Sequence, residues 1–203
     1  MVARTMRVFH RNHAGRPVRV AWMFEELGEP YELTVLTREE GKSAEHRLRH
    51  PLGRVPVLED DEGFLFESAA ICLHLADIHP EAGLVPPPGT RERALVYQWS
   101  IFTPAELEPP LIESALQAER DPERSAAARR RFDAAAGAVA TALNGNEYLV
   151  GRRFSVADVL VGTALAFTAR AGFAEELPQN LKDYLARLAQ RPAYQRAFAR
   201  TSG

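Results

Sequence analysis

Hydrophobic positions change their spacing near the middle of the chain. In the first half, short apolar runs typical of strands alternate with amphipathic stretches typical of helices, in the order β-α-β-α-β-β-α. The strands are expected at residues 6–9, 31–36, 57–59 and 64–66, and the helices at residues 18–27, 43–49 and 68–78. Gly28 is well placed to end the first helix. This order predicts one small mixed sheet covered by helices.

Every periodic segment of the second half is of the helical type. The helices are expected at residues 90–101, 121–142, 155–167, 181–190 and 193–200. Thr90 and Asp121 are suited to cap helices, and Ser155 with Asp158 forms a capping box. Prolines at positions 104, 109 and 110 should kink or break the first of these helices.

The two halves are separated by a stretch that cannot continue a helix. Residues 83–89 read Gly-Leu-Val-Pro-Pro-Pro-Gly, and three consecutive prolines favour a stiff, extended connection. The sequence therefore predicts a mixed domain over residues 1–82, a linker over 83–89 and an all-helical domain over 90–203.

Composition narrows the functional classes. Hydrophobic residues make up 46% of the chain and charged residues 26%, which is the balance of a globular protein and not of a disordered one. A formal charge of −2 argues against nucleic acid as a partner. The absence of a long apolar segment or an apolar signal core indicates no membrane association and a cytoplasmic location.

The potential metal ligands are too few for a site. Cys72 is the only cysteine, which excludes an intrachain disulfide and a zinc site built from cysteines. His46 and His50 could share a helix face, but no third ligand accompanies them. We therefore expect no metal ion and no tightly bound cofactor.

Several short motifs occur in a familiar order. They are Trp22–Tyr31, Gly53–Leu58, Phe66–Ile71, Leu149–Gly151 with Phe154–Asp158, and Arg191–Tyr194. Together they resemble the cytosolic glutathione S-transferase superfamily, in its bacterial type. The resemblance implies a thioredoxin-like N-terminal domain that binds glutathione, an all-α C-terminal helical-bundle domain and a homodimer.

The resemblance also implies a glutathione site. Val55–Pro56 looks like the family's cis peptide bond, which would turn the Val55 backbone towards the cysteinyl part of the tripeptide. Ser68, at the start of a helix, would bind the γ-glutamyl carboxylate, and Glu67 the ammonium group. The alternative for Ser68 is a helix N-cap, which the same geometry would also serve.

The remaining contacts with glutathione would come from basic residues. Arg54 stands where the family often has a polar contact, although a solvated arginine is the alternative. His50 is a weaker candidate for the glycine carboxylate of the tripeptide, as is Lys42.

The chain departs from the family in the loop that opens the first helix. Family members commonly place Ser, Cys or Tyr there to stabilise the glutathione thiolate, whereas residues 9–17 contain none of these. We expect Asn12 and His13 to take the catalytic role, assisted by Arg16 and by backbone amides of the loop. The alternative is that these residues only form the loop.

A second, apolar substrate is implied by the resemblance. Tyr97, Ile101 and Phe102 lie on the helix expected to line its pocket, although core packing or a dimer contact would explain them equally well. The expected activity is conjugation of glutathione to small hydrophobic electrophiles. A glutathione-dependent disulfide reductase or peroxidase is the alternative, as is a non-catalytic glutathione-binding or protein-interaction module, which the missing Ser, Cys or Tyr favours.

Overall fold

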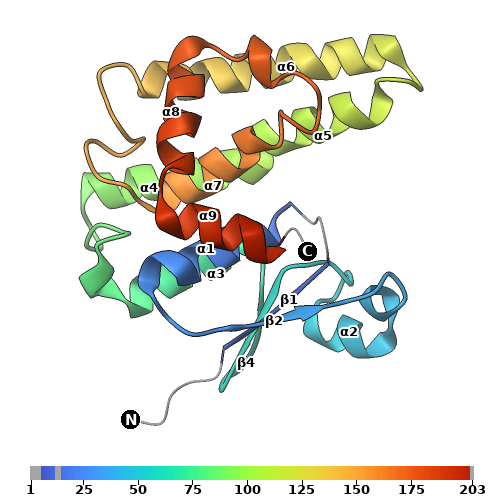
Figure 1. Ribbon diagram of the computed structural model, residues 1–203, viewed down its shortest axis with the longest axis vertical. Coiled ribbons are helices and arrows are strands. Elements are labelled where there is room, and N and C mark those ends of the chain that lie inside the picture. Colours follow the sequence, from blue (N-terminus) through green and yellow to red (C-terminus); the bar gives the residue numbers. More distant parts are fainter. Residues whose placement is uncertain (1–5, 12–14, 202–203) are drawn as a thin grey trace. The chain divides into compact units, whose positions relative to one another are not determined.

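The computed structural model of the protein describes residues 6–11 and 15–201. Contacts within the chain divide it into two compact units (Figure 1). Unit 1 consists of residues 1–83 and 190–203, and unit 2 of residues 84–189. The final helix is thus grouped with the N-terminal unit, whereas the sequence pattern places it with the helices that precede it.

Unit 1 contains a mixed sheet of four strands. These are β1 (Arg7–His10), β2 (Glu32–Val35), β3 (Val57–Asp60) and β4 (Gly63–Phe66), in the order β2-β1-β3-β4. Strand β1 is parallel to β2 and antiparallel to β3, and β3 is antiparallel to β4. The expected order of strands and helices is confirmed, and with it the thioredoxin-like fold.

The helices of unit 1 are α1 (Pro17–Leu27), α2 (Ala44–Arg49), α3 (Ser68–Ile78) and α9 (Pro192–Thr201), with short 3₁₀ turns η1 (Glu40–Lys42) and η2 (Pro80–Ala82). Helix α1 packs against both α3 and α9. Gly28 adopts the left-handed conformation at the end of α1, as its sequence position predicts. Glu26 and Arg191 form a two-bond ion pair between α1 and the segment that leads into α9.

Unit 2 is all helical. It contains α4 (Arg91–Phe102), the π-helical turn η3 (Thr103–Leu107), α5 (Glu108–Gln117), α6 (Pro122–Ala142), α7 (Val156–Ala166), η4 (Ala174–Glu176) and α8 (Gln179–Ala189). Thr90 and Asp121 cap α4 and α6 as expected. The predicted break near Pro104 occurs as the turn η3, which joins α4 to α5.

The core of unit 2 is organised around α7. Residues 156–165 of this helix are all buried, because the helix is apolar on nearly every side. The capping box at its start is present, and the Asp158 carboxylate also accepts bonds from Leu149 N–H and Tyr184 O–H. Asp158 therefore joins three segments of unit 2.

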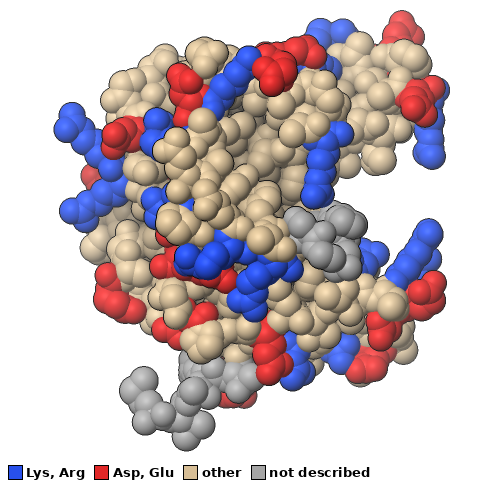
Figure 2. Space-filling view, viewed as in Figure 1, with Lys and Arg blue, Asp and Glu red and all other residues tan. Residues whose placement is uncertain are grey.

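Charged side chains of both signs share the same part of the surface. Figure 2 shows basic and acidic side chains intermixed on the face that it draws. Among the described residues, no helix is both long enough and apolar enough to cross a membrane.

Candidate functional site

The strand register of unit 1 brings the two predicted glutathione motifs to one end of the sheet. Val57 of β3 pairs with Phe66 of β4 in an antiparallel ladder. The residues just before Val57 therefore lie beside those just after Phe66. This places the Val55–Pro56 segment next to Glu67 and the start of α3.

Val55, two residues before β3, has an unusual main-chain geometry. Its peptide bond to Pro56 is cis, as the resemblance implies. The Val55 side chain packs against the buried cluster of Phe9, Leu36 and Val57, which anchors the segment. Within residues 6–11 and 15–201, no hydrogen bond joins the Val55 amide or carbonyl to the rest of the chain. Both groups are thus available to an incoming peptide backbone.

The start of α3 contradicts the alternative in which Ser68 is the helix N-cap. Glu67, and not Ser68, is the N-cap residue, and the Glu67 side chain makes no capping bond. Glu67 has φ of 70°, a strained conformation for a residue other than glycine. Ser68 is the first helical residue and is 4% exposed. Free amides of this first turn and the helix dipole favour a negatively charged ligand.

The hydroxyl of Ser68 has a partner that the sequence does not reveal. Nη1 of Arg19, on the buried face of α1, donates to Ser68 Oγ over 3.3 Å. Arg19 is only 1% exposed, although arginine is rarely buried. The one hint in the sequence is its position between Val18 and Val20 in an apolar helix.

His50 lies buried close to this end of the sheet. Its Nδ1 accepts the amide hydrogen of Leu52 over 3.1 Å, so the ring hydrogen of the neutral form is on Nε2. The ring centre is 4.8 Å from that of Phe66. Burial lowers the pKa of His50, while the nearby charge of Glu67 opposes this effect. His50 is therefore favoured as a neutral donor.

A second buried histidine supports the same segment. His46 of α2 is fully buried, and its Nε2 lies 2.9 Å from the carbonyl oxygen of Arg54. The sequence indicates no role for His46 other than that of a possible metal ligand. Among the described residues, no group of three or more His, Cys, Asp or Glu side chains could hold a metal ion.

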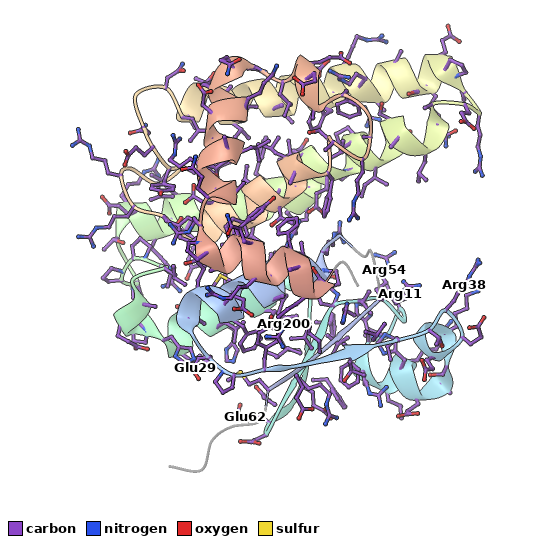
Figure 3. All side chains as sticks on the ribbon, viewed as in Figure 1. Arg11, Glu29, Arg38, Arg54, Glu62 and Arg200 are labelled. Atoms are coloured by element: carbon purple, nitrogen blue, oxygen red, sulfur yellow. The ribbon has the colours of Figure 1, made fainter. Side chains whose placement is uncertain are left out.

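Arginines are found in several parts of unit 1. Figure 3 shows Arg11 and Arg54 at the same end of the sheet in that view. Gly41 lies between the two arginines in space. A Cβ atom at Gly41 would contact the Arg11 side chain, and the Gly41 carbonyl oxygen lies close to Gly53, the neighbour of Arg54. Arg54 is exposed, which is compatible with both predictions made for it. Arg16, half-buried, is the N-cap residue of α1.

The two predicted catalytic residues cannot be placed. Asn12 and His13 lie outside the described residues. His10, at the end of β1, is 1% exposed, and burial lowers its pKa. Cys72 is fully buried, and burial raises the pKa of its thiol to about 12, which suits an inert core residue.

The residues predicted for a second substrate are separated in unit 2. Tyr97 is 41% exposed and Ile101 is 68% exposed, so neither belongs to the core of this unit. Phe102 stacks edge-on against Trp99 and lines a cavity of about 340 Å³ together with Pro109 and residues of α6. Tyr97 and Ile101 do not line this cavity.

Known proteins show the same combination of a mixed four-stranded unit and a helical unit. The model of the glutathione S-transferase N-terminal domain matches residues 18–83, and that of the C-terminal domain matches residues 86–192. Glutathione S-transferase GST-4.5 of Xanthomonas campestris pv. campestris is 32% identical over 149 residues, which are 70% of this chain and 73% of that protein.

Solved structures agree with the sequence comparison. A glutathione transferase from Methylococcus capsulatus str. Bath has a TM-score of 0.87 at 27% identity, covering 97% of this chain and 98% of that chain. A sphingomonad glutathione S-transferase complexed with glutathione has a TM-score of 0.85 at 26% identity, covering 96% of this chain and 98% of that chain.

The fold and the site thus define a protein with a thioredoxin-like unit followed by a helical unit of the transferase type. The chain belongs to the glutathione S-transferase family, of the bacterial cytosolic type.

Proposed function

We propose that this protein binds glutathione in unit 1 and uses the thiolate of the bound tripeptide against small hydrophobic electrophiles. The observation that carries the proposal is the register of β3 and β4, which brings the Val55–Pro56 segment and the start of α3 together. The Val55 main chain would suit the cysteinyl part of glutathione. The start of α3, next to it, would suit the γ-glutamyl carboxylate.

Each part of the tripeptide has a candidate partner. The Val55 amide and carbonyl would pair with the cysteinyl residue, as one strand pairs with another. The hydroxyl of Ser68 and the first-turn amides would bind the γ-glutamyl carboxylate, and Glu67 the ammonium group. Arg54 and the neutral Nε2–H of His50 would reach the glycine end. Pro56 sets the direction of the backbone between these contacts.

The chemical step requires an ionised sulfur. The thiol proton passes to solvent, the sulfur electron pair forms a bond to the electrophilic carbon, and a leaving group such as chloride departs with the bonding electrons. The nucleophile is the sulfur of glutathione, so the protein needs no covalent nucleophile of its own. The thiolate would be stabilised by hydrogen bonds and charge from Asn12, His13 and Arg16. The second substrate would contact the exposed side chains of Tyr97 and Ile101, whereas Phe102 lines a separate cavity. A cytoplasmic homodimer is the assembly expected.

Glutathione binding is tested first, by isothermal titration calorimetry. Ser68→Ala should weaken binding about tenfold, the effect of losing one hydrogen bond to a charged group. Thr141→Ala is the control, because Thr141 is an exposed residue of α6 whose hydroxyl bonds to its own helix. A titration of the native protein without heat of binding would refute the proposal.

Turnover then separates the transferase from its alternatives. The native protein should conjugate glutathione to 1-chloro-2,4-dinitrobenzene faster than it reduces a disulfide or a peroxide. The reverse order would indicate a reductase or peroxidase, and binding without either activity would indicate a binding module. Thiolate absorbance measured against pH should show a higher glutathione pKa in Asn12→Ala, and an unchanged value would exclude Asn12 from catalysis.

A further inference from the structure

The side chain of Arg19 fixes the role of Ser68 as a hydrogen-bond donor. A guanidinium group carries only donors, so in the 3.3 Å contact between Nη1 and Oγ the serine oxygen must accept. The hydroxyl hydrogen of Ser68 cannot point back to Arg19 and is directed elsewhere. A hydroxyl held in this way is ready to donate to an anion.

The position of Arg19 adds a positive charge behind that hydroxyl. Arg19 and Ser68 are 1% and 4% exposed, so little solvent screens the charge. The same residue also meets α3 through its main chain, since the Cys72 thiol donates to the Arg19 carbonyl oxygen over 3.7 Å. Arg19 thus contacts α3 at its first residue and again one turn later. These two contacts hold the guanidinium group next to the N-terminus of the helix.

From these contacts we infer that Arg19 is a positioning residue for the γ-glutamyl carboxylate of glutathione. It orients the Ser68 hydroxyl towards the carboxylate and supplies charge that favours the anion, without touching the thiol. This inference rests on the proposed function, because it names the group that makes the start of α3 selective for a carboxylate.

The decisive test compares two ligands by calorimetry. One is glutathione, and the other is 4-aminobutyryl-cysteinyl-glycine, which lacks only the γ-glutamyl carboxylate. The native protein should bind glutathione at least tenfold more tightly than the truncated ligand. Arg19→Gln, which removes the charge but keeps a polar group of moderate size, should weaken glutathione binding about tenfold and leave binding of the truncated ligand nearly unchanged.

Related variants sharpen the comparison. Ser68→Ala should show the same selective loss, and the double variant Arg19→Gln/Ser68→Ala should lose little more than either single variant, because both act on one contact. Arg19→Lys, which keeps the charge, should recover part of the selectivity. Arg7→Gln is the matched control, because Arg7 begins β1 and lies at the end of the sheet away from Val55 and Ser68. This variant should bind both ligands as the native protein does.

The outcomes distinguish this inference from the proposed function. Equal losses for both ligands in Arg19→Gln would mean a general structural role and would overturn the inference, as would unchanged binding of both. Native protein that binds glutathione without discriminating against the truncated ligand would overturn the inference alone. If Arg19→Gln does not fold, Ser68→Ala decides: a variant that still prefers glutathione to the truncated ligand would overturn the inference. Native protein that does not bind glutathione would overturn the proposed function itself.

Discussion

The imidazole of His46 donates a hydrogen bond from Nε2 to the carbonyl oxygen of Arg54 over 2.9 Å. A carbonyl oxygen can only accept, so the ring hydrogen of His46 is on Nε2. His46 is fully buried, and the bond therefore holds the backbone that leads into Val55–Pro56 from inside unit 1. A residue without direct access to a ligand thus supports the main chain that would bind it.

His46→Phe should weaken both folding and glutathione binding. The substitution leaves the Arg54 carbonyl without its donor, which should lower the free energy of unfolding by about 1–3 kcal/mol. We expect glutathione affinity to fall severalfold as the segment loosens. Urea denaturation and calorimetry measure the two effects. Glu45→Gln, at an exposed site of the same helix, is the control, and losses no greater than those of the control would contradict the role given to His46.

Gly53→Ala should destabilise the same segment through the backbone. Gly53 has φ of 60°, and a Cβ atom there would lie 2.9 Å from the carbonyl oxygen of Gly41. Gly28→Ala is the matched control, with φ of 69° and no atom within 4 Å of the added Cβ. The left-handed conformation alone should lower the free energy of unfolding by about 1–2 kcal/mol in Gly28→Ala. Denaturation curves should show a larger loss for Gly53→Ala, and equal losses would refute the steric argument.

Local signals explain why most elements of the fold could be predicted. Ser68–Ile78 begins and ends as the sequence predicts, and Asp121 caps α6 through its side-chain bond to the Arg124 amide. Such caps depend on residues three or four positions apart, which the sequence displays directly. Boundaries of the other predicted elements differ by one or two residues, because the ends of helices and strands depend on their neighbours. The sequence does not predict helix α5, because Pro109 and Pro110 indicate a break, whereas in the structure both lie in its first turn, where proline is tolerated.

Contacts between distant residues could not be predicted in this way. The burial of Arg19 depends on a serine 49 positions later, and the support of Arg54 by His46 depends on how α2 packs. The grouping of α9 with unit 1 depends on contacts such as that between Glu26 and Arg191, which are 165 positions apart. Periodicity shows which face of a helix is apolar, but not which partner covers it.

The ion pair of Glu26 and Arg191 should show measurable coupling. Arg191 donates two bonds, of 2.6 and 2.7 Å, to a carboxylate that also accepts from Trp22 Nε1 over 2.8 Å. The Glu26 side chain is only 9% exposed. A double-mutant cycle with Glu26→Gln and Arg191→Gln should give a coupling energy of about 1–2 kcal/mol. This is more than the coupling energy of an exposed ion pair.

The exposed pair formed by Arg124 and Glu113 offers the comparison for that cycle. Its coupling energy should stay below about 1 kcal/mol. Equal coupling in the two cycles would show that burial of Glu26 adds nothing to the contact between α1 and the segment leading into α9.

Mild acid should destabilise the protein partly through His10. Burial lowers the pKa of His10 in the folded state, and a hydrogen bond with the Arg11 backbone opposes this shift only in part. As the pH falls below the unfolded pKa of about 6.5, the unfolded chain takes up a proton more readily than the folded one. The contribution of neutral His10 to stability is therefore present above that pH and is lost as the pH falls through the folded pKa.

Urea denaturation at about pH 7.5 and about pH 5 measures this effect. His10→Phe, which keeps a buried ring that cannot titrate, should show a smaller loss of stability between the two pH values than the native protein. Val8→Ala is the control, because it weakens the same strand without changing a titratable group, and its loss between the two pH values should match the native one. An unchanged loss in His10→Phe would exclude His10 as the source.

Asp158→Ala should be among the most damaging substitutions in unit 2. A capping box alone is worth about 0.5–2 kcal/mol. The structure adds bonds from Leu149 N–H and Tyr184 O–H, at 2.9 and 3.0 Å, to a carboxylate that is fully buried. Removing it leaves several buried donors without an acceptor, so the free energy of unfolding should fall by about 3 kcal/mol or more. The control is Asp121→Ala, which removes only the exposed cap of α6. Its loss of free energy of unfolding should stay within the range of a single cap. Equal losses for the two variants would show that the contacts with Leu149 and Tyr184 contribute little to stability.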